Sequence, residues 1–133
     1  MKYTIIILLV GIHSLVFGQF ETPREIVQEQ LDAYNEGDID RFMAVFSPNI
    51  QLFTLGEKGP LVEGKDKVRS VYTNLFDKSP DLKSEVINRT IIGNKVIDYE
   101  IITGRNGDAS PMYLVMVYEV EEGLIIRAHA VRE

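Results

Sequence analysis

The 133-residue sequence contains no cysteine. This absence excludes disulfides, thiolate metal sites, a cysteine nucleophile and the acylated cysteine of a lipoprotein. Histidine is scarce as well, with His13 and His129 as the only two. There is also no phosphate-binding loop, dinucleotide fingerprint or Ser-His-Asp spacing, and no repeat or low-complexity segment. The sequence therefore predicts one domain of ordinary composition whose core holds without covalent cross-links.

The sequence has only one long apolar run, and it lies near the N-terminus. Lys2 precedes 15 nearly uncharged residues, Tyr3 to Phe17, and Gly18 provides a small residue before a cut at Gln19. This pattern is typical of a secretory signal peptide, whereas a membrane-spanning helix needs roughly 20 apolar residues. We therefore expect residues 1–18 to be a signal peptide and residues 19–133 to form an exported domain, periplasmic or secreted, with an uncleaved anchor as the alternative.

Removal of the signal peptide changes the charge and the metal-binding potential. Lys2 is its only charged residue, so the 14 basic and 20 acidic residues become 13 and 20, and the formal charge moves from −6 to −7. Such an acidic domain repels nucleic acid and anionic lipid, so neither is an expected partner. His13 is lost too, which excludes a two-histidine metal site within one mature chain, and we expect no metal.

Helix signals precede strand signals along the mature chain. Thr22, Pro23 and Glu25 form a capping-box start, and Gly37 is a suitable helix end. Helices are expected over residues 23–36, 39–46 and 65–77, the last with a strong apolar stripe. Strands are expected over residues 50–55, 86–92, 95–102, 112–120 and 124–131, with a brief return at 61–62 and a hairpin turn at 93–94. Helices followed by a mostly antiparallel sheet indicate an α+β fold.

In the last strand, alternation predicts which side chains face the helices. Ile126, Ala128 and Ala130 form the small apolar set that should face inward. His129 would then lie outside beside Arg127, which favours a solvent or interface role over that of a catalytic base.

The strand over residues 95–102 alternates Asp98 and Glu100 with Ile97, Tyr99 and Ile101. Carboxylates that face inward would share a pocket, their pKa values would separate, and one could act as an acid or base. The alternative is that both face water while the isoleucines pack. Arg105, in the loop over residues 104–111, would either border the pocket mouth or belong to a solvated turn.

The strand over residues 112–120 is apolar on both faces. One face covers the core, and the other would be an unusually large bare patch on a monomer. We therefore expect a homodimer through the outer face of the sheet, where Leu114 and Met116, with Tyr99 nearby, are the expected contact residues.

Three segments together resemble a known family. They are AYNEGDIDRFMAVFSPNIQL (Ala33–Leu52), VEGKDKVRSVYTNLF (Val62–Phe76) and YEVEEGLIIRAHAVRE (Tyr118–Glu133). Their order and spacing resemble the nuclear transport factor 2-like superfamily, in its SnoaL-like, ketosteroid-isomerase-like branch, over roughly Ile26 to Glu133. The resemblance implies a cone-shaped α+β roll, with three N-terminal helices packed on a curved, mostly antiparallel sheet and an apolar pocket in its mouth. It also implies dimers through the sheet.

The resemblance does not carry over the chemistry of ketosteroid isomerases. Thr54 stands at the position of the general-base aspartate, Gln30 at that of the oxyanion-hole tyrosine, and Val115 at that of the protonated acid. Thr54 is not a base near neutral pH and Val115 donates no hydrogen bond, so steroid isomerisation is not expected. The same alignment places Asp98 and Glu100 on the concave side.

Two functions stay open. The first is a cofactor-free enzyme of isomerase or cyclase type, in which Asp98 or Glu100 moves a proton on a small apolar organic molecule. The second is a non-catalytic ligand-binding or protein-interaction accessory domain. The expected pocket lining is Gln30, Tyr34, Phe46, Thr54, Tyr72, Phe76 and Tyr113.

Overall fold

The computed structural model describes residues 22–133. The predicted signal peptide and its cleavage site lie outside these residues, and export remains a prediction. Among the described residues, no helix is long and apolar enough to cross a membrane.

The helices form largely where their local signals predict them. Helix α1 (Pro23–Glu36) begins at Thr22, whose side chain and Glu25 make the reciprocal bonds of a capping box, and ends at Gly37 with φ 65°. Helix α2 (Ile39–Ala44) begins at Asp38, whose side chain accepts a hydrogen bond from the Arg41 backbone. Helix α3 is Lys65–Lys78.

The sheet has six strands in the order β2-β1-β6-β5-β4-β3. Neighbouring strands are antiparallel except β1 and β6, which are parallel. The strands are β1 (Phe46–Thr54), β2 (Val62–Glu63), β3 (Lys83–Ile92), β4 (Lys95–Thr103), β5 (Met112–Glu121) and β6 (Leu124–Val131).

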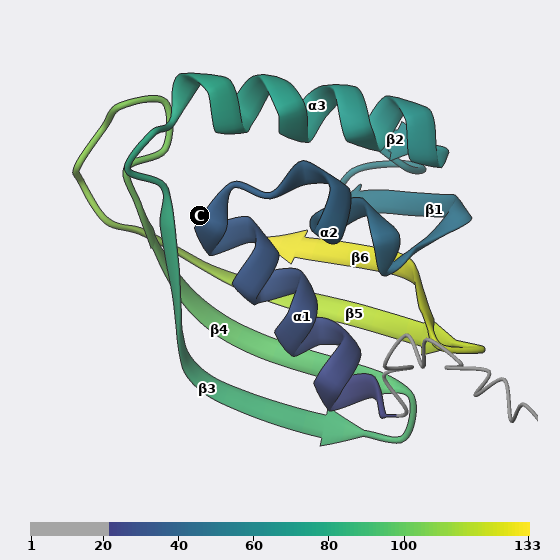
Figure 1. The fold of residues 1–133 in the computed structure, drawn as a ribbon. Helices are drawn as coiled ribbons and strands as arrows, with labels where there is room; N and C mark the ends of the chain where they lie inside the picture. Colours follow the sequence, from purple (N-terminus) through teal and green to yellow (C-terminus); the bar gives the residue numbers. More distant parts are fainter. Residues whose placement is uncertain (1–21) are drawn as a thin grey trace, which may run out of the picture.

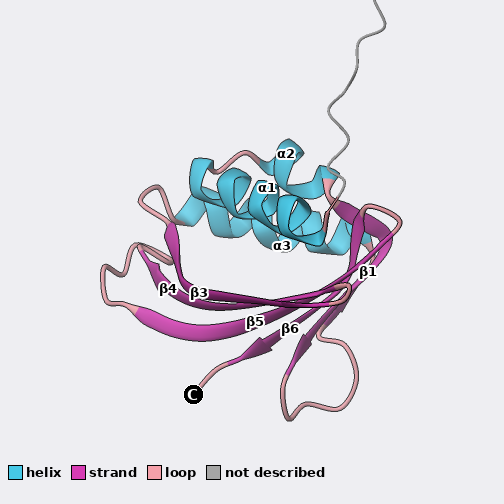
Figure 2. Ribbon diagram, turned by 90° about the horizontal axis from the view of Figure 1, so that it is seen from below, coloured by secondary structure: helices cyan, strands magenta, loops and turns pink. Residues whose placement is uncertain are grey.

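The sheet is strongly curved and carries all three helices on its concave side (Figures 1 and 2). Register shifts in the β3–β4, β5–β6 and β1–β6 pairs explain part of this bend, because a bulge kinks a strand and increases its twist. Helix α1 packs over β3 to β6, while α3 packs on β1 and β2. The α+β roll predicted from the sequence is therefore confirmed.

The boundary between α2 and β1 differs from the expectation. The second helix ends at Ala44 instead of residue 46, and β1 begins at Phe46, before Pro48. Phe42 and Phe46 are both fully buried, with ring centroids 4.9 Å apart. The apolar residues at the expected end of this helix do belong to the core. Phe46, however, enters the core from β1, which pairs with β6.

The faces of β5 and β6 correct part of the sequence analysis. Leu114 pairs with Glu100, which faces inward, and therefore Leu114 faces inward as well. Met116 also lies on this inner side, so neither residue belongs to the outer, dimer-forming face proposed for them. In β6, a bulge places fully buried Ile125 on the inner face in place of Ile126, whereas the inward positions of Ala128 and Ala130 are confirmed.

Candidate functional site

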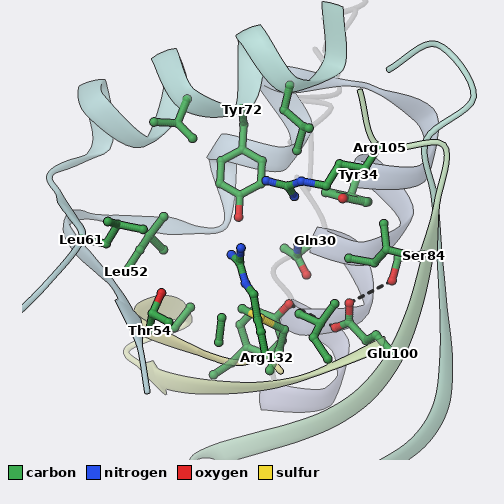
Figure 3. A pocket seen from close by; sticks show the side chains of 18 of the residues that line it. Gln30, Tyr34, Leu52, Thr54, Leu61, Tyr72, Ser84, Glu100, Arg105 and Arg132 are labelled. Carbon is green, nitrogen blue, oxygen red and sulfur yellow. Dashed lines mark hydrogen bonds between the residues drawn. The ribbon is translucent and has the colours of Figure 1, made fainter. Parts of the chain in front are cut away.

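A cavity of about 210 Å³ lies between α1, α3 and the concave face of the sheet (Figure 3). Its wall is mostly apolar, which suits a small organic molecule, and its polar groups are few. The apolar lining includes Leu31, Leu52, Leu61, Val62, Val71, Leu75, Ile102, Met112, Leu114, Met116, Ala128 and Ala130. The polar lining consists of Gln30, Tyr34, Thr54, Tyr72, Ser84, Glu100, Arg105, Tyr118 and Arg132.

Glu100 is the carboxyl group in this wall. Its side chain comes from the inner face of β4 and is only 5% exposed. Ser84 Oγ donates a hydrogen bond to Glu100 Oε2 over 2.9 Å (Figure 3). The Tyr118 hydroxyl donates to Oε1 over 3.4 Å. Burial raises the pKa of Glu100 from its ordinary value of 4.5 to about 7; the Ser84 hydrogen bond opposes this rise and the charge of Asp98 adds to it. Glu100 is therefore poised to change protonation state near neutral pH.

Asp98 also faces inward but does not line the cavity. It is 1% exposed, and the Arg89 guanidinium holds both carboxylate oxygens, with Nε at 2.7 Å and Nη2 at 2.8 Å. Arg89 also donates to Gln28 Oε1 on α1 over 2.9 Å. The expectation that both carboxylates point to the concave side is met. The shared pocket is not, because Asp98 does not line the cavity and a buried guanidinium satisfies its charge.

Three buried tyrosines surround the cavity. Burial raises the pKa of Tyr34, Tyr72 and Tyr118 above the ordinary tyrosine value, so their hydroxyls stay protonated at neutral pH. Within residues 22–133, the Tyr34 hydroxyl and Gln30 Oε1 are buried without a hydrogen bond of normal geometry. Arg105 is close enough for its charge to lower the pKa of Tyr34 and so oppose part of the burial effect.

The predicted lining residues divide into three groups. Gln30, Tyr34, Thr54 and Tyr72 line the cavity as expected. Phe46 and Phe76 do not, because both pack in the aromatic core around Phe42, with ring centroids within 5.6 Å of it.

Tyr113 lies on the opposite side of the sheet from the cavity and is 51% exposed. It pairs with Ile101 on the outer face, one residue out of phase with the inward pair of Leu114 and Glu100. Val115 shares the outer face, so its match to an isomerase acid does not place it at the cavity either.

Several lining residues had no recognisable signal in the sequence. Ser84 and Tyr118 join Glu100 only because β3 and β5 flank β4 in the sheet. Arg132 follows β6 directly and lines the cavity. Arg105 also lines it, which agrees with the first of the two interpretations given for its loop. No local pattern links these four residues, because strand pairing, the packing of the β4–β5 loop and the end of β6 bring them together from distant parts of the chain.

His129 lies away from the cavity lining. The His129 ring stacks on Phe53, with centroids 4.5 Å apart and planes 8° from parallel, and it does not line the cavity. The part of the chain from residue 22 onward holds no cluster of three or more His, Asp or Glu side chains that could bind a metal ion.

Comparisons with known proteins identify the fold and the family. A cystatin-fold protein from Novosphingobium aromaticivorans superposes with a TM-score of 0.77 at 22% identity, over 85% of this chain and 100% of the other. A proposed polyketide cyclase from Sinorhizobium meliloti gives 0.68 at 21% identity, over 80% and 93%. An epoxide hydrolase of LEH-like type from M. tuberculosis gives 0.73 at 13% identity, over 84% and 82%.

These identities are low enough that the likeness to each solved structure concerns the fold alone. No curated protein sequence matches the chain. The SnoaL-like domain family, however, matches residues 27–128, which is most of the chain and includes most of the cavity. The chain therefore belongs to the family of SnoaL-like domains.

Proposed function

We propose that the cavity binds a small organic molecule and that Glu100 exchanges a proton with it, in a cofactor-free reaction of isomerase or cyclase type. The observation that carries this proposal is a carboxyl group in an apolar wall with a pKa raised to about 7. A group with such a pKa accepts and donates protons with comparable ease near neutral pH. The structural neighbours that include a proposed polyketide cyclase and an epoxide hydrolase are consistent with small-molecule chemistry on this fold.

The proposed step needs only the side chains already in the wall. The Glu100 carboxylate accepts a proton from a carbon next to a carbonyl of the ligand, and the electron pair of that C–H bond moves into the carbonyl to give an enolate. The tyrosine hydroxyls are donors for the developing oxyanion, because burial keeps them protonated. Return of the proton to the same or another carbon restores the carboxylate.

Asp98 acts in this scheme as a positioning residue. Its ion pair with Arg89 ties β4 to β3, and through Gln28 to α1, so it fixes the strand that carries Glu100. Its negative charge also raises the pKa of Glu100. This role replaces the direct catalytic one expected from the sequence.

Proton exchange offers a test that does not require the natural substrate. Small cyclic ketones, lactones and keto acids are incubated with the protein in D₂O, and deuterium uptake next to the carbonyl is followed by NMR. We expect Glu100→Gln to slow the exchange by about a hundredfold or more, as removal of a general base does. Glu85→Gln, the same change at an exposed position on neighbouring β3, is the matched control. Equal exchange rates for the wild type and Glu100→Gln would reject the proposed role.

A non-catalytic binding domain is the second candidate. It is favoured by the two hydrogen bonds that already occupy the Glu100 carboxylate, and by the absence of a base at Thr54. In that case ligands bind the cavity without any exchange that depends on Glu100, so binding and exchange measured on the same compounds separate the two functions.

A further inference from the structure

Two arginines face one end of the cavity. Arg105 comes from the loop between β4 and β5, and Arg132 follows β6 directly. In Figure 3 the Arg132 guanidinium points toward the Tyr72 hydroxyl, and that of Arg105 lies beside Tyr34 and Tyr72. The charges of both arginines act on the Tyr72 hydroxyl, lowering its pKa against the effect of burial. The two guanidinium groups therefore serve the same region of the cavity.

Neither guanidinium has a carboxylate partner within residues 22–133. Arg41, Arg69, Arg89 and Arg127, by contrast, each form an ion pair, and the one other described arginine, Arg24, is exposed and lies away from the cavity. The chain carries 20 acidic residues against 14 basic ones, so unpaired arginines are not explained by a shortage of carboxylates. Two cations beside a partly enclosed apolar wall favour an anion supplied from outside.

Two buried polar groups point independently to a bound molecule. Gln30 and Tyr34 are each 6% exposed. Among the described residues Gln30 Oε1 has no hydrogen-bond partner, and the Tyr34 hydroxyl has only the Arg105 side chain within reach. Both residues line the cavity, and in Figure 3 the Gln30 amide oxygen points into it. Buried polar atoms are almost always hydrogen-bonded, so a ligand with polar atoms at this end would complete the site.

We propose that the ligand is a small carboxylic acid, with its carboxylate between Arg105 and Arg132 and its apolar body against Met112, Leu114 and Met116. The planar fork of a guanidinium matches a carboxylate, and an apolar body suits a wall that is mostly apolar. The body then extends toward Glu100, which pairs across the strands with Leu114. This inference rests on the proposed binding function of the cavity, but not on proton transfer by Glu100.

The test compares acids with their uncharged amides. Cyclohexanecarboxylate, phenylacetate and octanoate are each titrated against the full mature chain beside their primary amides, and Kd is measured by NMR. We expect each acid that binds to have a Kd about tenfold or more below that of its amide, as hydrogen bonds to charged groups give. In the double variant Arg105→Gln/Arg132→Gln, the ratio should fall to about one.

Control variants separate the cavity charge from the general charge of the protein. Arg24→Gln removes an exposed arginine that does not line the cavity, and it should leave the ratio unchanged. Arg105→Lys and Arg132→Lys keep the charge without the fork, and they should keep part of the preference for the acid. They also supply the test if the double glutamine variant fails to fold.

Each result decides the proposal. Equal binding of acid and amide to the wild type would overturn it while leaving a ligand-binding cavity. A preference for the acid that survives Arg105→Gln/Arg132→Gln would overturn it too. Binding of neither the acids nor the amides would overturn the carboxylic-acid proposal as well. The proton-exchange assay decides the catalytic proposal separately, because equal exchange rates for the wild type and Glu100→Gln would reject that proposal alone.

Discussion

Asp98 and Glu100 show how the partner of a residue, more than its type, sets its chemistry. They lie two residues apart on the same face of β4, and both are buried. Arg89 holds the first as a charged pair, while the second has only hydroxyl donors, from Ser84 and Tyr118. Because Glu100 has no counter-ion in direct contact, burial raises its pKa although its hydroxyl donors oppose part of the rise.

The raised pKa of Glu100 predicts that this residue destabilises the protein as pH rises. Between pH 4.5 and about 7 the folded state holds a proton that the unfolded state has released, so the free energy of unfolding falls across this window and then levels off. The shift corresponds to about 3 kcal/mol. Urea unfolding at pH 5 and pH 8 should therefore show Glu100→Gln more stable than the wild type at pH 8, by about 1 to 3 kcal/mol, and little different at pH 5.

Glu85→Gln provides the control for this measurement, because Glu85 is exposed on the neighbouring strand. It should change the free energy of unfolding equally, and only slightly, at both pH values. A difference between wild type and Glu100→Gln that does not vary with pH would show that the Glu100 carboxyl is not protonated preferentially in the folded state.

Among the elements, the loop between β4 and β5 positions Arg105 at the cavity. Gly104 has φ 76°, and a Cβ there would lie 2.2 Å from the Asp81 carbonyl oxygen. The Asn106 backbone N–H also donates to Ser79 Oγ over 2.8 Å. The loop that carries Arg105 is thereby held against the connection between α3 and β3.

Gly104→Ala tests this close approach. The added methyl group meets backbone and cannot move aside cheaply, so we expect a loss of about 2 kcal/mol or more in the free energy of unfolding. Gly107→Ala is the matched control, because Gly107 has φ 79° in the same loop but no atom within 4 Å of its Cβ position. It should lose only about 1 kcal/mol, the cost of the left-handed backbone. Equal losses in urea unfolding would contradict a steric role for Gly104.

At the scale of the whole fold, none of the elements described in residues 22–133 covers the outer face of the sheet (Figure 2). The helices cover only the concave side (Figure 2). On the outer side Tyr99 and Tyr113 are 40% and 51% exposed, with ring centroids 6.4 Å apart. Val115 and Val117 are half-buried on the same face. We propose that two copies of the chain associate through this face, now with Tyr113 in the place first given to Leu114 and Met116.

Sedimentation at micromolar concentration checks this proposal. The wild type should sediment as a dimer, and Tyr113→Lys should shift it to the monomer, because a charge in an apolar interface carries a desolvation cost. Ile92→Lys, at the exposed end of β3, adds the same charge away from the centre of the face and should remain dimeric. A wild type that sediments only as a monomer would exclude the dimer at that concentration.

The sequence alone determined the features that depend on neighbouring residues. The capping box at Thr22, the helix end at Gly37 and the β3–β4 turn at Gly93-Asn94 are local signals, and the structure has each of them. The inward direction of Asp98 and Glu100 came from the family resemblance. Alternation alone left it open, because a period of two gives the two faces of a strand but not which one is buried.

Only the tertiary structure decided which polar groups meet at the cavity. The early end of α2, the partner of Asp98, the inner face of β5 and the arrival of Arg132 all depend on pairings between residues far apart in the chain. Tyr113 precedes Leu114 by one residue and therefore faces outward instead of into the cavity. A bulge in the β5–β6 pair turns Ile125 inward in place of Ile126. Strand register is fixed by the packing of the whole sheet, and this is why composition and periodicity predicted the roll but not the contents of its cavity.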